Sequence, residues 1–79
     1  MPKEQPAVTA GAAIKAYIQE HGITEAAAAK VGGLSQPTFH RLINDQTDPP
    51  FSTLLRVIGG LGLSLRWLHD RGVRPPEAS

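Results

Sequence analysis

Glycine and proline divide this chain into short segments, and no segment alternates apolar and polar residues for more than a few positions, as a strand would. Between these breaks, apolar residues recur three and four positions apart, as Ile14, Tyr17 and Ile18 do. This spacing is typical of a helix with one buried face. A chain patterned in this way is predicted to fold as a compact all-α domain of short helices.

The breaks predict five helices, at about residues 10–21, 25–32, 36–44, 50–61 and 65–71. Four of them follow a residue that suits an N-cap, namely Thr9, Thr24, Ser35 and Ser64. Pro37 fits the first turn of the third helix, because the backbone N–H at that position has no partner within a helix. Glycines at 59, 60 and 62 predict that the fourth helix ends either loosely or in close contact with another helix.

A length of 79 residues allows one domain, which we assign to residues 9–72, with a flexible leader at 1–8 and a flexible tail at 73–79. The chain has no cysteine, and its three histidines are scattered, so neither a metal site nor a cofactor is expected. No apolar run approaches the roughly 20 residues that cross a bilayer. A cytoplasmic protein with no membrane partner is therefore expected.

Residues 24–44 carry the arrangement that indicates a function. Two helices of similar length are joined by a short turn that contains glycine, which is the arrangement of a helix-turn-helix motif. Ala29 leaves room for the two helices to cross, and Gly33 permits a positive φ where the chain reverses. Leu34 and Phe39 are predicted to pack behind the turn and to fix the angle of the second helix.

Residues 22–44, GITEAAAAKVGGLSQPTFHRLIN, resemble the helix-turn-helix of the Cro/CI-type phage repressors, also called the lambda-repressor-like or xenobiotic-response-element family. The resemblance extends over about residues 10–72, in order and without a gap. The matching positions are Thr24, Ala29, Gly33, Ser35, Phe39, Leu42, Pro49, Thr53, Leu54, Val57, Leu61, Gly62, Trp67 and Leu68. The family implies a five-helix domain that binds double-stranded DNA.

The resemblance also implies that Gln36, Pro37 and Arg41 contact base edges from a recognition helix at about 36–44. Glutamine pairs with adenine and arginine with guanine, each for about 1–3 kcal/mol of discrimination, and proline packs on a thymine methyl group. His40 shares this face and is a further candidate for a base. The candidates for phosphate contacts are polar side chains on or beside the motif: Thr24, Thr38, Asn44, Thr47 and Ser52.

The chain departs from the family pattern at several positions. Ile18 and Ile43 stand where many relatives carry an arginine and a glutamate that pair, which predicts that the first and third helices touch. Asp45 replaces a usual glycine. Together with Glu25 and Asp48 it adds negative charge near the expected DNA surface, so DNA binding is predicted to be modest and salt-sensitive.

The interpretation that these features favour is a repressor-like transcriptional regulator, encoded by a phage or plasmid, that binds a palindromic operator as a homodimer. The expected dimer surface contains Leu63, Leu65 and Trp67, although Trp67 equally fits the core of the monomer. A net charge of +1 leaves open an alternative, an antitoxin or adaptor that uses the same fold to bind a protein such as a toxin. An enzyme is not expected, since the sequence shows no nucleophile–base set, paired acids or phosphate loop.

Overall fold

The computed structural model describes residues 9–72, which form five helices and no strand. The helices are α1 (Ala10–Glu20), α2 (Glu25–Val31), α3 (Gln36–Ile43), α4 (Phe51–Gly60) and α5 (Leu65–Asp70). The predicted all-α class is confirmed, and each predicted helix is present with ends that differ by about one residue. The segments 1–8 and 73–79, which we expected to be flexible, lie outside the described residues.

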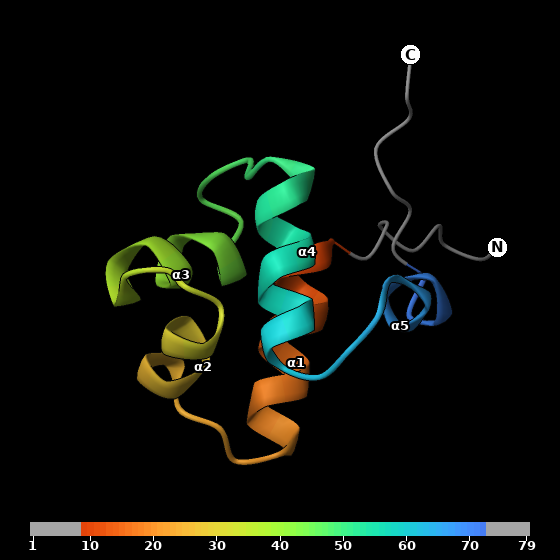
Figure 1. Ribbon diagram of the computed structural model, residues 1–79, viewed down its shortest axis with the longest axis horizontal. Coiled ribbons are helices and arrows are strands. Elements are labelled where there is room, and N and C mark those ends of the chain that lie inside the picture. Colours follow the sequence, from red (N-terminus) through yellow and green to blue (C-terminus); the bar gives the residue numbers. More distant parts are fainter. Residues whose placement is uncertain (1–8, 73–79) are drawn as a thin grey trace, which may run out of the picture.

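The helices surround one shared core (Figure 1). α2 and α3 form a pair on one side of α1 and α4, and α5 lies on the opposite side. α3 packs against both α2 and α1, while α4 packs against α2. None of the helices within 9–72 is long and apolar enough to cross a membrane.

Side-chain caps begin three of the helices. The hydroxyl groups of Thr9, Thr24 and Ser35 accept hydrogen bonds from the backbone N–H three residues later. Ser64 is the N-cap residue of α5, as expected, but its side chain makes no capping hydrogen bond. Its backbone is more extended than that of Ser35, with a φ of −124° against −74°.

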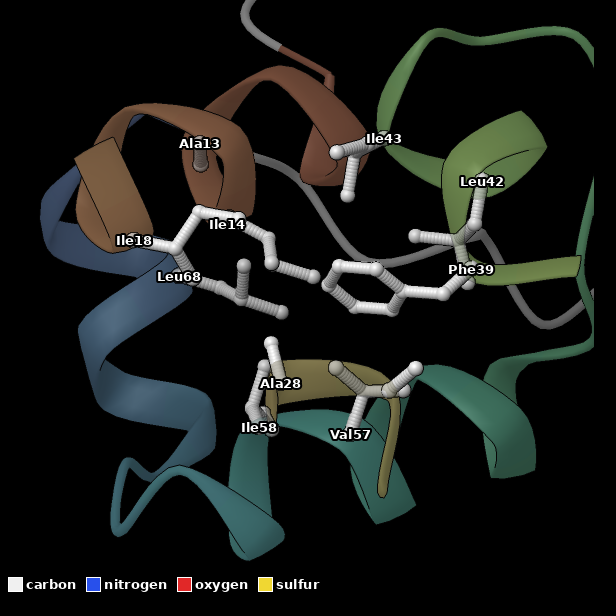
Figure 2. Packing of buried hydrophobic residues seen from close by; sticks show 11 residues of the cluster. Ala13, Ile14, Ile18, Ala28, Phe39, Leu42, Ile43, Val57, Ile58 and Leu68 are labelled. Carbon is white, nitrogen blue, oxygen red and sulfur yellow. The ribbon is translucent and has the colours of Figure 1, made fainter. Parts of the chain in front are cut away.

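Phe39 of α3 lies at the centre of the core, with its ring directed toward Ile14 and with Ala28 and Val57 on the facing helices (Figure 2). Its side chain is 0% exposed. All five helices contribute to the buried cluster, which contains Ala13, Ile14, Ile18, Ala28, Ala29, Phe39, Leu42, Ile43, Val57, Ile58 and Leu68. Burial of a phenylalanine side chain contributes about 1.5–3 kcal/mol, so this residue is a principal anchor of α3.

Two glycines allow helices to approach at backbone distance. A methyl group at Gly11 would overlap the carbonyl oxygen of Leu42, and one at Gly60 would overlap that of Val31. α1 therefore rests directly on the end of α3, and α4 rests directly on the end of α2. Of the two possibilities for the glycine-rich end of α4, close packing holds at Gly60, whereas Gly59 faces open space.

This difference predicts opposite effects for two adjacent alanine substitutions. Gly60→Ala should lower the free energy of unfolding by about 1–3 kcal/mol, because a methyl group there must displace the backbone of α2. Gly59→Ala should raise it by about 0.5–1 kcal/mol, because alanine favours a helix over glycine. Urea unfolding followed by circular dichroism measures both, and equal effects of the two variants would contradict the close packing.

Ile18 and Ile43 are 3% and 2% exposed and belong to the same core cluster. Their helices pack together, and the Cα atom of Ile43 would lie 3.3 Å from a Cβ at Gly11. Figure 2 shows Ile43 beside the first turn of α1, on the side where Ile14 enters the core. Contact between α1 and α3 is thus present, while direct contact between the two isoleucine side chains stays a prediction.

Ile43→Glu should destabilise the domain by about 3–5 kcal/mol, because it buries a carboxylate that has no cation beside it. Arg41→Glu, on the exposed face of the same helix, is the control and should change stability by less than about 0.5 kcal/mol. Adding Ile18→Arg to Ile43→Glu should recover part of the loss if the two side chains meet. Thermal unfolding unchanged by Ile43→Glu would contradict the burial of this position.

Candidate nucleic-acid interface

The turn between α2 and α3 is fixed by its backbone. Gly33 has a φ of +73°, as predicted, and the N–H of Leu34 donates to the carbonyl of Ala29 at 2.9 Å. Leu34 then packs against the core, and Phe39 is fully buried one turn into α3. Both sides of the turn are anchored, so the direction of α3 relative to α2 is set by packing.

α3 has one buried and one exposed face. Phe39, Leu42 and Ile43 point into the core. The predicted base-contacting residues are all exposed and line one shallow hollow with two further residues; the lining is Glu25, Gln36, Pro37, His40, Arg41 and Gln46. The structure therefore brings the predicted base-contacting set together on one surface.

The predicted phosphate-contacting residues fall into two kinds. Thr24, Thr38, Thr47 and Ser52 are exposed. Asn44 is half-buried, and its amide is already engaged: Oδ1 accepts from Lys15 Nζ at 2.8 Å, and Nδ2 donates to the carbonyl of His40 at 2.8 Å. A phosphate contact from Asn44 would have to share these bonds.

Asp45 occupies the left-handed region with a φ of +58°. That conformation is uncommon for any residue except glycine, and aspartate and asparagine tolerate it better than most. Its Oδ2 accepts a hydrogen bond of 3.0 Å from the hydroxyl of Thr9 at the start of α1. This bond offsets part of the backbone cost and directs the carboxylate toward α1, which explains how an aspartate fits where relatives have glycine.

Glu25 also has a partner, which the sequence did not reveal. Its Oε1 lies 2.9 Å from Nδ1 of His40, across the crossing of α2 and α3. The two residues are 15 positions apart on different helices, so no local pattern links them. Of the three carboxylates expected to oppose DNA, two are therefore engaged within the domain, and Asp48 is exposed.

The basic side chains near this surface differ in their surroundings. Arg41 is exposed and forms no ion pair with any carboxylate of residues 9–72. Arg56 of α4 lies beside the turn, with its Cδ 3.4 Å from the position of a Cβ at Gly33. The guanidinium of Arg41 is thus free of ion pairs within the described residues, and Arg41 lines the same hollow as Gln36 and His40.

The predicted dimer residues lie on and before α5. Trp67 is half-buried and packs edge-on against Tyr17, with ring centroids 5.5 Å apart, while the Arg71 guanidinium lies 4.9 Å from the Trp67 ring. Leu63 is also half-buried, whereas Leu65 is 42% exposed. Trp67 therefore takes part in the packing of its own domain, and Leu65 presents its side chain to solvent.

Two helices crossing at a glycine turn, the second with a buried apolar face and an exposed polar face, define a helix-turn-helix domain. The model of the Cro/CI-type helix-turn-helix family (HTH_3) matches residues 14–68, from α1 into α5, and the chain belongs to this family. Among curated proteins, no match to the chain is found. Membership in this family supports DNA binding as the general activity of the domain, and the domains of this family are DNA-binding and not catalytic.

Proposed function

We propose that this chain is a sequence-specific transcriptional regulator of the repressor type that inserts α3 into the major groove. The observation that supports this most directly is the arrangement of Gln36, Pro37, His40 and Arg41 on one exposed face. The opposite face of the same helix is held in the core by Phe39. A rigid helix with a polar outer face is what the major groove accommodates.

Each side chain of this face has a base edge that suits its chemistry. The amide of Gln36 pairs with adenine, and the guanidinium of Arg41 pairs with O6 and N7 of guanine. Pro37 has no donor and packs on a thymine methyl group. Thr24, Thr38, Thr47 and Ser52, with Asn44 where its amide can be shared, hold the phosphates on either side.

Arg41 gives the sharpest test of sequence-specific binding. An operator is first selected from random duplexes, and its affinity is then compared with that of a scrambled duplex at two salt concentrations. Arg41→Ala should weaken operator binding by about 1–3 kcal/mol and relax the preference at one base position. It should also reduce the salt dependence, since a cation near the phosphates is removed.

Arg41→Lys is the matched control, because it keeps the charge and loses the fork that pairs with guanine. It should retain the salt dependence and weaken the base preference, because a lysine still donates to guanine but not as a bidentate fork. If the wild-type protein bound neither duplex at micromolar concentration and low salt, the regulator would be rejected. The antitoxin or adaptor, which uses the fold to bind a protein, would then be the better interpretation.

We also propose that two copies act on a palindromic operator. A dimer of this class places its recognition helices about 34–36 Å apart, one turn of DNA. The proposed contact is the surface around Leu63, Leu65 and Trp67. Leu65 supports it, because it exposes a large apolar side chain on α5, and α5 lies on the side of α1 and α4 opposite to α2 and α3 (Figure 1).

Two leucines of similar exposure allow this contact to be tested. Leu65 is 42% exposed on α5 and Leu55 is 40% exposed on α4. Leu65→Glu should dissociate the dimer in sedimentation velocity experiments and lower affinity for the full operator, because a charge would be buried between the copies. Leu55→Glu adds the same negative charge, so it controls for the general electrostatic loss of DNA affinity, and it should leave the sedimentation of the dimer unchanged. Dissociation of the dimer by both variants alike would contradict the α5 interface.

A further inference from the structure

A series of polar contacts crosses the exposed side of three helices. Lys15 of α1 donates to Asn44 Oδ1 at 2.8 Å, and Asn44 Nδ2 donates to the carbonyl of His40 at 2.8 Å. Nδ1 of His40 then lies 2.9 Å from Oε1 of Glu25 on α2. The series begins at an ammonium group and ends at a carboxylate. These two groups determine which atoms of Asn44 and His40 donate hydrogen bonds and which accept them.

The two ends fix the donors and acceptors. A lysine ammonium only donates, so the oxygen of the Asn44 amide faces Lys15 and its NH2 group faces His40. An ionised carboxylate only accepts, so Nδ1 of His40 carries a proton and donates to Glu25. A neutral imidazole has a single N–H, and Nε2 is therefore an acceptor.

The lone pair of Nε2 is left for a ligand. In the described part of the chain, the only polar group within hydrogen-bond distance of Nε2 is Asn44 Nδ2, at 3.4 Å from Nε2 and 3.5 Å from Nδ1. A nitrogen that is almost equally far from both ring nitrogens is in line with neither lone pair. The His40 side chain is 54% exposed and lines the same hollow as Gln36 and Arg41.

We propose that Glu25 is a specificity-determining residue of the recognition surface, acting as a positioning residue that holds His40 in its Nδ1–H form. Nε2 then accepts a hydrogen bond from a base amino group, N6 of adenine or N4 of cytosine. Guanine and thymine present a carbonyl oxygen, O6 or O4, at the corresponding major-groove position. Such an oxygen and the Nε2 lone pair are both acceptors, so no hydrogen bond forms between them. The inference rests on the proposed insertion of α3 into the major groove.

The protonation of His40 is measured first, without DNA. Nitrogen-15 spectra of histidine-labelled protein at about pH 9, above the range in which an ordinary histidine titrates, report which ring nitrogen carries the proton. His40 should be in the Nδ1–H form, with exposed His69 as the internal reference. Glu25→Ala should return it toward the Nε2–H form that free histidine favours, and Glu25→Gln should give a mixture, because an amide both donates and accepts.

The base preference is measured second, by selecting random duplexes at the same pH. The wild-type protein should enrich adenine or cytosine at one position, and Glu25→Ala should reduce that preference about five- to tenfold, the value of one hydrogen bond. Positions that depend on Gln36 and Arg41 should not change. Glu20→Ala, which removes a carboxylate from α1, is the control and should leave every base preference intact.

The outcomes separate the two proposals. Removing a negative charge at Glu25 should raise affinity for every duplex alike, so only a change in base preference supports the inference. Wild-type His40 in the Nε2–H form, or a base preference unchanged in Glu25→Ala, would overturn it while leaving DNA binding intact. Failure of the wild-type protein to bind any duplex would reject the proposed function, and the spectra would still show whether Glu25 sets the form of His40.

Discussion

The burial of Phe39 is the constraint on which the rest of this domain depends. Its ring fills the space among α1, α2 and α4, so the apolar face of α3 packs against the core in one position (Figure 2). This packing also fixes the positions of the polar side chains on the opposite face, because a helix has a regular geometry over two turns. Close approach at Gly11 then holds the end of α3 against α1. Packing therefore sets the position of the recognition surface, and polar contacts adjust it.

The same polar contacts orient the carboxylates near α3 without removing their charge. A chain with a net charge of +1 and three carboxylates near α3 attracts phosphates weakly. Asp45 accepts from the hydroxyl of Thr9, and Glu25 lies 2.9 Å from Nδ1 of His40, so each of these two carboxylates is directed toward a group of the protein and keeps its negative charge. Arg41 has no such partner within the described helices. The guanidinium of Arg41 is thus free of ion pairs on the face of α3 that we propose meets the base edges.

The sequence predicted the helices, the turn and the exposed face of α3 because these depend on local patterns. Helical spacing, N-cap residues and a glycine at a positive φ act within a few residues of each other. The pairs Lys15–Asn44, Thr9–Asp45 and Glu25–His40 were not predicted, because each joins different elements and depends on how those elements cross. Ser64 shows the limit of local patterns as well. A suitable residue stands at the N-cap, but its hydroxyl makes no hydrogen bond to a helical N–H.

The Glu25–His40 pair lies apart from the residues that hold the fold together. The core consists of apolar side chains, and none of the polar or charged residues among 9–72 is buried in it. Glu25 and His40 lie outside this core and are partly exposed, so their contact adds little to stability, as is usual for exposed pairs. In the proposed mechanism, a change at Glu25 alters which ring nitrogen of His40 carries the proton and leaves the packing of Phe39 untouched. Stability and base preference would then depend on different residues of the same two helices, so that one could change while the other is kept.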